Sequence, residues 1–389
     1  MPPFAEARVD VSAIADNIAL LQERAPNSQL MGVVKADGYG HGIIAAARAK
    51  LAGGATWLGT AFIEEALQLR RAGITAPVLA WILPPGAPIA EAIAADIDLG
   101  VSAAWLIDQI ATAARETGRP ARVHLKADTG LNRGGVTADE WHATLAEAAR
   151  FEAAGLLRVV GLFSHFACAD EPGHPSIAAQ LDAFHEASAA ADKAGLRPEL
   201  RHMANSAATL TLPEAHFDLV RTGIAAYGLN PIPSLGDVGL RPAMTLTSRI
   251  AVAKRVPEGH GVSYGHRYVT DRPTTLALVP LGYGDGVPRA ATNRAPVGIA
   301  GRRFTISGTV CMDQFVVDVG ETPVAAGDPV TLFGPGDDNT PTTQDWADVL
   351  DTISYEIVTR VAPRVPRVYI GTPDQETGIL PGENVAPGP

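Results

Sequence analysis

Short apolar runs alternate with amphipathic stretches over the first 235 residues of the chain. Runs of strand length and character lie at residues 30–34, 56–59, 78–83, 97–101, 123–126, 157–164, 200–203 and 219–221. Most gaps between them hold Ala-, Leu-, Glu- and Arg-rich segments that predict helices, such as 62–71, 105–116 and 141–153. Roughly eight strand–helix units in this length predict an α/β fold, a (β/α)8 barrel. A doubly wound sheet is the alternative, but the glycines at 38, 40 and 42 do not match its dinucleotide fingerprint.

The pattern changes in the Pro- and Gly-containing stretch 231–242, which we interpret as a linker. Beyond it, short Val-, Thr- and Ile-rich runs predict strands, and one segment predicts a short helix; they lie at 244–252, 275–279, 303–307, 314–319 and 330–333, with the helix at 343–350. We therefore expect the barrel in residues 1–235, a mostly β domain in 243–371 and a loosely ordered tail at 372–389.

Composition narrows the class of protein. The formal net charge of −11 argues against nucleic acid or an anionic membrane as a partner. The N-terminus lacks an apolar signal core and no run has transmembrane length, so a cytoplasmic protein without a membrane partner is expected. Cys168 and Cys311 lie far apart without metal-type spacing, which favours free thiols and no metal centre.

Lys35 stands where the first barrel strand is expected to end, and glycines at 38, 40 and 42 follow it. Glycines let the backbone bend closely around a bound group. A buried lysine readily has a lowered pKa, which makes Lys35 a candidate base or Schiff-base amine. A lysine whose head simply reaches solvent is the alternative interpretation.

Polar residues also follow other predicted strands, at 126–133, 164–165, 202–206 and 221–224. In a (β/α)8 barrel these strand ends gather at one face, where active sites form. Asn205 and Ser206 open a predicted helix, and Gly223 and Ile224 offer backbone N–H groups, so these two loops predict an anion site. An ordinary helix cap is the alternative for Asn205 and Ser206. A phosphate site on the same face as Lys35 suggests pyridoxal 5′-phosphate.

Several longer motifs occur in order along the chain. They include VVKADGYGHG at 33–42, LKADTGLNRGG at 125–135, VRTGIAAYG at 220–228, VSYGHRY at 262–268, GTVCMDQ at 308–314 and SYEIVTRVAPRVPRVY at 354–369. Together they resemble the bacterial alanine racemases, barrel-type pyridoxal-phosphate enzymes, over essentially the whole chain. Asp37 and Gly38 depart from the Asn and Ala that relatives often carry, and this departure does not touch Lys35.

The resemblance implies how the cofactor would be held. Lys35 would carry it covalently, and Arg221 would face its pyridine nitrogen. Arginine does not give up a proton to the ring, so the ring would be a weaker electron sink and side reactions would be suppressed. The other implied cofactor-binding residues are Tyr39, His165, Asn205, Ser206, Gly223, Ile224 and Tyr355.

The resemblance also implies racemisation by two bases on opposite faces of the substrate, Lys35 and Tyr264. A free tyrosine ionises near pH 10, so a tyrosine base needs help from nearby positive charge. His165 and Arg221 would supply that help. Tyr264 would come from the partner subunit, since the family forms head-to-tail homodimers with composite sites. The family's first strand, here about 4–9, tends to pack with the C-terminal domain.

Further implied roles concern the substrate. Arg133 would bind the substrate carboxylate, and Met312 and Asp313 would help to bind it. Lys126 would either be carbamylated and orient the arginine, or be an ordinary ion-paired lysine. The implied lining of the substrate entry consists of Asp170, Tyr283 and Arg289.

The implied reaction is the interconversion of L-alanine and D-alanine, supplying D-alanine for peptidoglycan. A racemase of broader specificity, acting also on serine, is an alternative because a pocket discriminates one methylene only modestly. A barrel-type pyridoxal-phosphate decarboxylase would carry an acidic residue near the pyridine nitrogen and a Cys base, in contrast to Arg221 and Tyr264. A cofactor-binding regulator built on the barrel alone would lack residues 243–371.

Overall fold

The computed structural model describes residues 4–371, and the tail predicted at 372–389 lies outside this range. The described chain forms two compact units. The barrel unit comprises residues 14–38 and 46–240, and the β-rich unit comprises residues 4–13, 39–45 and 241–371.

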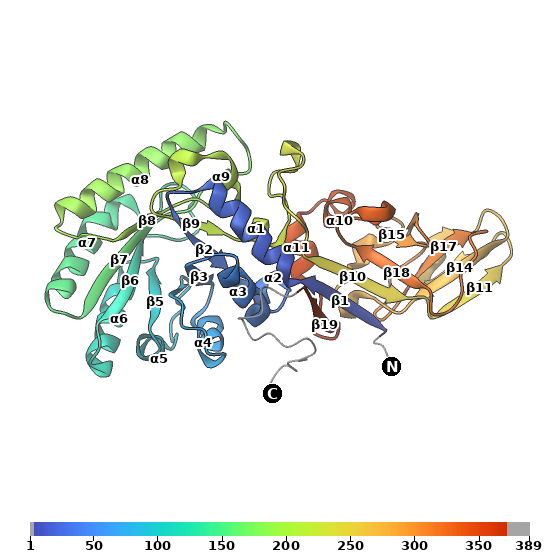
Figure 1. The fold of residues 1–389 in the computed structure, drawn as a ribbon, viewed down its shortest axis with the longest axis horizontal. Helices are drawn as coiled ribbons and strands as arrows, with labels where there is room; N and C mark the ends of the chain where they lie inside the picture. Colours follow the sequence, from blue (N-terminus) through green and yellow to red (C-terminus); the bar gives the residue numbers. More distant parts are fainter. Residues whose placement is uncertain (1–3, 372–389) are drawn as a thin grey trace. The chain divides into compact units, whose positions relative to one another are not determined.

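Eight parallel strands form the sheet of the barrel unit, as predicted (Figure 1). They are β2 (Gln29–Val33), β3 (Trp57–Thr60), β4 (Val78–Ala80), β5 (Ile97–Val101), β6 (Ala121–Lys126), β7 (Leu157–Phe163), β8 (Leu200–His202) and β9 (Leu219–Thr222). Neighbouring strands pair in the order β8-β7-β6-β5-β4-β3-β2-β9. Backbone hydrogen bonds of 3.0 Å from Asp218 to Arg201 and of 2.9 Å from Arg221 to Ala204 then bring β9 back to β8. The sheet is therefore nearly closed into a barrel.

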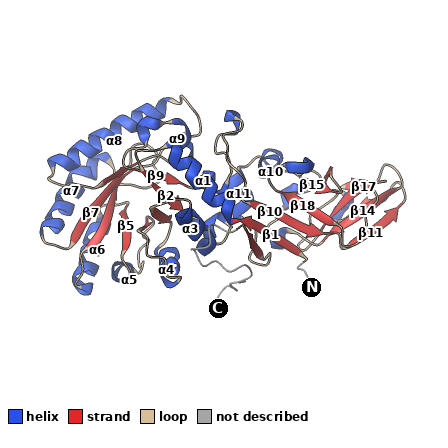
Figure 2. Cartoon of the chain, viewed as in Figure 1, coloured by secondary structure: helices blue, strands red, loops and turns tan. Residues whose placement is uncertain are grey.

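Helix α1 (Val11–Arg24) precedes β2, and helices follow most of the barrel strands: α3 (Ile43–Ala52), α4 (Ile63–Arg71), α5 (Ile89–Ala94), α6 (Trp105–Thr117), α7 (Ala138–Ala153), α8 (Pro175–Lys193) and α9 (Ser206–Thr211). Helices α6 and α7 each bury one apolar face, and Figure 2 shows α6, α7 and α8 outside the strands β5, β6 and β7. Gly118 ends α6 in a left-handed conformation, with φ 66°, which glycine adopts without steric penalty.

Apolar side chains fill the barrel interior because a parallel sheet covered by helices is buried on both faces. One cluster consists of Met31, Trp57, Leu79, Val160, Leu200 and Leu219. These residues come from six different strands and from both halves of the barrel unit. Their packing fixes the strand ends that carry the polar residues discussed below.

The β-rich unit contains a six-stranded sheet in the order β16-β15-β18-β10-β1-β19, a three-stranded sheet β11-β14-β17 and the short pair β12-β13. Its strands are β1 (Ala5–Asp10), β10 (Met244–Arg249), β11 (Val252–Val256), β12 (Gly261–Val262), β13 (Tyr268–Val269), β14 (Thr274–Val279), β15 (Pro296–Ile299), β16 (Arg302–Thr305), β17 (Phe315–Gly320), β18 (Pro329–Phe333) and β19 (Arg367–Ile370). Two helices follow β18, α10 (Thr343–Leu350) and α11 (Ser354–Thr359). The first strand, β1, pairs antiparallel with β10 and parallel with β19.

The single strand predicted at 244–252 is wrong. The structure divides it into β10 and β11, which belong to different sheets. The backbone of Ile250 bonds to Asp328, whereas that of Ala251 bonds to Leu278 on β14. The chain changes sheets between these two residues, and its continuous Thr/Val/Ile pattern does not mark the change.

Within residues 4–371, no helix combines the length and the apolar character that crossing a membrane would require.

Candidate active site

Lys35 lies two residues beyond the end of β2, in a short left-handed turn. Ala36, Asp37 and Gly38 have φ angles of 53°, 52° and 61°. Each non-glycine residue in this region costs roughly 1–2 kcal/mol, and such strain persists only where neighbours enforce it. Glu65 in the first turn of α4 is one such neighbour, because its Oε1 accepts a 2.6 Å hydrogen bond from the Ala36 N–H. The turn therefore holds Lys35 at the carboxyl end of the barrel.

The Lys35 side chain is half-buried. Burial lowers its pKa, the charge of Arg133 lowers it further, and Glu65 partly opposes both effects. A lowered pKa makes the neutral, nucleophilic amine more accessible near neutral pH. Lys35 thus has the chemistry expected of a Schiff-base lysine.

Arg221 also lies at the end of a barrel strand, β9, and its guanidinium is buried. Its Nη1 donates to His202 Nδ1 and to the His202 carbonyl, both at 2.9 Å. Its Nη2 lies 2.7 Å from the Ser164 carbonyl, 3.0 Å from the Met203 carbonyl and 3.2 Å from His165 Nδ1. These five contacts share the four Nη hydrogens. Within the described residues they leave the Nε–H for a further acceptor. Burial lowers the pKa of Arg221 to about 9, so the group stays charged at neutral pH.

Positive charge converges around His165, a half-buried residue that lies just beyond the end of β7. Burial holds the pKa of its imidazole well below the ordinary value, and four cationic side chains lower it further: Arg221, Arg133, Lys126 and Lys35. Burial and the charges of Arg133 and Arg221 also lower the pKa of Lys126 to about 8. The structure therefore brings these five predicted residues together into a basic site suited to an anion.

The two loops of the predicted phosphate site also lie together. Ser206 Oγ accepts hydrogen bonds from the backbone N–H of Gly223 at 2.9 Å and of Ala225 at 3.3 Å. Asn205 caps α9 by accepting a 3.0 Å bond from the Ala208 N–H. The Gly223 N–H is therefore directed at Ser206 in this structure, and its predicted role toward an anion stays a prediction. The Ser206 hydroxyl hydrogen remains available to donate to an anion.

In the β-rich unit, Tyr264, Met312 and Tyr283 lie on three neighbouring loops. The Thr309 hydroxyl donates to the Tyr264 carbonyl at 2.7 Å, and the Tyr283 N–H donates to the Cys311 carbonyl at 3.0 Å. Tyr264, Met312 and Tyr283 are 71 %, 55 % and 44 % exposed, respectively.

Other predicted residues of this unit surround the same loops or lie near α11. Asp313 is exposed and accepts a 2.7 Å bond from Arg364, which also binds the buried Asp285. The rings of Tyr39 and Tyr355 lie 6.2 Å apart. Arg289 is exposed in a 3-10 turn, Arg289–Ala291. Asp170, of the barrel unit, is exposed on the loop after β7.

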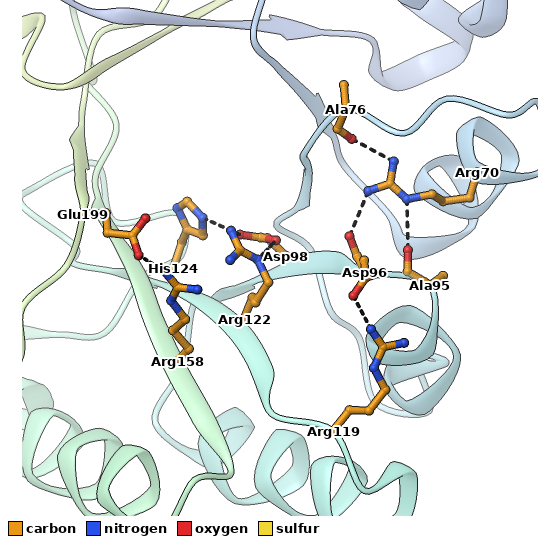
Figure 3. A network of polar contacts seen from close by, with 10 residues as sticks. All are labelled: Arg70, Ala76, Ala95, Asp96, Asp98, Arg119, Arg122, His124, Arg158 and Glu199. Carbon is orange, nitrogen blue, oxygen red and sulfur yellow. Dashed lines mark hydrogen bonds and ion pairs between the residues drawn. The ribbon is translucent and has the colours of Figure 1, made fainter.

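Sequence reasoning missed three site-related residues: Glu65, Asp98 and His124. Glu65 has no Ser or Thr N-cap three positions before it, so the capping pattern was not evident. Asp98 and His124 lie within apolar strands and are almost fully buried, and Figure 3 shows them in contact. A buried charged or polar residue inside a short strand was the available signal, since such residues need partners.

Comparison with known proteins agrees with this geometry. The family model described as the alanine racemase N-terminal domain matches residues 9–231, and that of the C-terminal domain matches residues 243–369. The alanine racemase of Thermobifida fusca is 68% identical over 95% of this chain and 99% of its own. Solved alanine racemases from Streptomyces lavendulae and Streptomyces coelicolor have TM-scores of 0.94 and 0.93 at 54% and 56% identity, and the alignments cover 96% and 95% of this chain and 98% of each of theirs. The chain therefore belongs to the alanine racemase family, enzymes that interconvert the two enantiomers of alanine.

Proposed function

We propose that this enzyme racemises alanine with pyridoxal 5′-phosphate and two bases, Lys35 and Tyr264 of the partner subunit, and thereby supplies D-alanine for peptidoglycan. The observation that carries the proposal is the convergence of Lys35, whose pKa is lowered, with a buried arginine and two further cations at one end of the barrel. No carboxylate stands directly against the Arg221 guanidinium among residues 4–371. A site of this charge suits a cofactor with a dianionic phosphate and a phenolic oxygen.

The residues present fit this group. Lys35 would hold it covalently, and the Nε–H of Arg221 would face its ring nitrogen. Ser206 and the loop of Gly223 and Ile224 would bind the phosphate, together with Tyr39 and Tyr355. Asn205 and His165 would also contact the cofactor. When bound, the cofactor withdraws electrons from the amino-acid Cα and makes its hydrogen acidic. Arg221 remains charged at neutral pH and therefore leaves the ring nitrogen without a proton.

The proton transfers fall to side chains on opposite faces of the substrate. Lys35 Nζ would take or return the proton on one face, where its lowered pKa favours the neutral amine. The hydroxyl of Tyr264 would act on the other face. Two separate bases let the substrate keep its place while the configuration changes.

The exposure of Tyr264, Met312 and Tyr283 supports a homodimer in which these loops complete the site of the other copy. Arg133 would bind the substrate carboxylate, with Met312 and Asp313 helping. Asp170, Tyr283 and Arg289 would line the entry. Lys126, if carbamylated, would turn one of the four cations into an anion and so orient Arg133.

The test combines a spectrum with an assay. Purified enzyme supplied with the cofactor is expected to absorb at roughly 420 nm and to lose this band on borohydride reduction. L-alanine should then yield D-alanine in an assay coupled to D-amino-acid oxidase. A protein that stays colourless, or a Tyr264→Phe variant that retains full activity, would contradict the proposal.

A further inference from the structure

A chain of buried hydrogen bonds runs from Arg221 across the barrel interior to Asp98. Arg221 Nη1 lies 2.9 Å from His202 Nδ1, and His202 Nε2 lies 2.9 Å from His124 Nδ1. His124 Nε2 then lies 3.1 Å from Asp98 Oδ2. The chain links strands β9, β8, β6 and β5, so it crosses the sheet from the proposed active site to the opposite side of the barrel.

Only one arrangement of hydrogens satisfies every bond of this chain. An arginine can only donate, so His202 Nδ1 must accept and the hydrogen of a neutral His202 must lie on Nε2. His202 Nε2–H then donates to His124 Nδ1, which leaves the hydrogen of His124 on Nε2, directed at Asp98. Every bond therefore points from Arg221 toward the carboxylate. Burial and the nearby Arg221 hold the pKa of His202 well below its ordinary value, which agrees with a neutral ring.

The barrel is built around this chain. Both imidazoles are fully buried. The Phe163 ring stacks on His202 with 5.0 Å between ring centroids, and Trp57 packs edge-on against His124 at 5.5 Å. The register of β6 against β7 shifts at His124, and a Cβ at Gly161 would overlap the His124 ring. A strand irregularity and a glycine thus make room for one imidazole.

Asp98 is anchored at the far end. It is 1% exposed, and Figure 3 shows it beside His124 and Arg122. Arg122 donates to its two oxygens, from Nε at 2.8 Å and from Nη2 at 3.1 Å. Burial alone would raise the pKa of Asp98, but the bonds and charges of His124 and Arg122 hold it below the ordinary value. Asp98 is therefore a carboxylate, the anionic end of the chain.

We propose that Asp98 and His124 are positioning residues for Arg221, acting through His202 to fix the plane and hydrogen-bond direction of the guanidinium. Four Nη hydrogens held in this way direct the remaining Nε–H at one point. This inference rests on the proposed role of Arg221 opposite the cofactor ring. It adds two residues that touch neither cofactor nor substrate.

The first test needs no variant. In protein labelled with 15N-histidine, with and without cofactor, His124 and His202 should each show one protonated and one bare ring nitrogen, with the hydrogen on Nε2. A His202 ring that carries its hydrogen on Nδ1, or is doubly protonated at neutral pH, would overturn the proposal. The cofactor absorbance is read separately, so a colourless protein would contradict the proposed function and not the hydrogen-bond chain.

The second test compares variants at His124. His124→Phe removes the acceptor for His202, whereas His124→Gln keeps an oxygen that can accept. Per mole of bound cofactor, kcat should fall roughly ten- to hundredfold in His124→Phe with KM little changed, as for other groups that orient a binding residue, and His124→Gln should recover most of it. A purely structural role would lower thermal stability alike in both and leave kcat per bound cofactor unchanged, which would overturn the proposal.

Asp98→Asn keeps the test decisive if His124→Phe does not fold. Its matched control is Asp96→Asn. Asp96 lies two residues before Asp98, pairs with Arg119 at the surface and is not part of the hydrogen-bond chain. Asp98→Asn should lower kcat and alter the His124 ring signals, while Asp96→Asn should leave both at wild-type values. Equal behaviour of the two variants would overturn the proposal.

Discussion

At the scale of single residues, Lys50 is the least expected feature of the barrel. Its side chain is fully buried, with Nζ donating 2.8 Å to the Val33 carbonyl and lying 3.8 Å from the centre of the Tyr227 ring. The Tyr227 hydroxyl donates to the same carbonyl at 3.1 Å. Burial holds the pKa of Lys50 well below its ordinary value. At pH values between this lowered pKa and the ordinary value, the folded protein therefore binds one proton fewer than the unfolded chain.

We expect Lys50→Met to raise the free energy of unfolding at pH 7 by roughly 1–4 kcal/mol, because an apolar side chain of similar length removes the desolvation penalty. The Val33 carbonyl keeps Tyr227 as its donor. The wild type gains stability with rising pH between its lowered folded pKa and the unfolded value of 10.5, since the unfolded state binds the extra proton there. The advantage of the variant should therefore shrink toward roughly pH 10.

Urea unfolding at both pH values measures this difference. The control is Lys193→Met, which removes an exposed lysine at the end of α8 and should change little. A Lys50→Met protein that is less stable than the wild type at pH 7 would show that the Nζ hydrogen bond outweighs desolvation.

Lys126 offers a second test at this scale. Only a neutral amine reacts with CO2, and with a pKa of about 8 roughly a tenth of Lys126 is neutral at pH 7. We expect 13C-labelled CO2 to give a carbamate signal that grows from roughly pH 7 to pH 9 at constant dissolved CO2. Lys126→Ala should abolish the signal and Lys193→Ala should retain it. A signal that persists in Lys126→Ala would assign the carbamate elsewhere.

At the scale of elements, the candidate active site and the hydrogen-bond chain behind it include departures from regular structure. The left-handed turn after β2 aims Lys35, and the register shift between β6 and β7 makes room for His124. Both lie beside residues with proposed roles, which is where strained or irregular backbone is usually retained. The helix and strand patterns of the sequence predict the regular parts but do not predict these departures.

Gly161→Ala tests the second departure. The new Cβ would overlap His124, so either the imidazole or β7 must move. We expect a loss of several kcal/mol in stability and a loss of racemase activity per folded molecule. Gly155→Ala is the control, because its Cβ meets open space and only the φ of 70° is unfavourable, which costs about 1 kcal/mol. Equal melting temperatures for the two variants would contradict the predicted overlap.

At the scale of the whole molecule, the two proposed bases belong to different units of the chain. Lys35 belongs to the barrel unit and Tyr264 to the β-rich unit, on a loop whose aromatic side chain is mostly exposed. An exposed apolar surface of this kind is typical of an interface. Two copies related by a two-fold axis would exchange these loops and form two equal sites.

Mixing two inactive variants tests this arrangement. Lys35→Ala and Tyr264→Phe, unfolded together and refolded in equal amounts, should form mixed dimers with one intact site each. Random pairing then restores about a quarter of the sites. Activity should return to about that fraction of the wild type, whereas each variant refolded alone stays inactive. No restoration would place both bases within one chain.

The alternation of apolar runs with amphipathic segments was sufficient to predict the eight barrel strands, since burial of a strand between helices leaves a direct trace in the sequence. Lys35, Arg221 and Ser206 could likewise be singled out, because polar residues at strand ends are visible without coordinates. The sheet change between β10 and β11, the bond that joins Ser206 to Gly223, and the chain from Arg221 through His202 and His124 to Asp98 were decided only by the tertiary structure. Each depends on residues distant in sequence meeting at hydrogen-bond distance, and only the packing of the barrel and its neighbouring sheets brings such residues together.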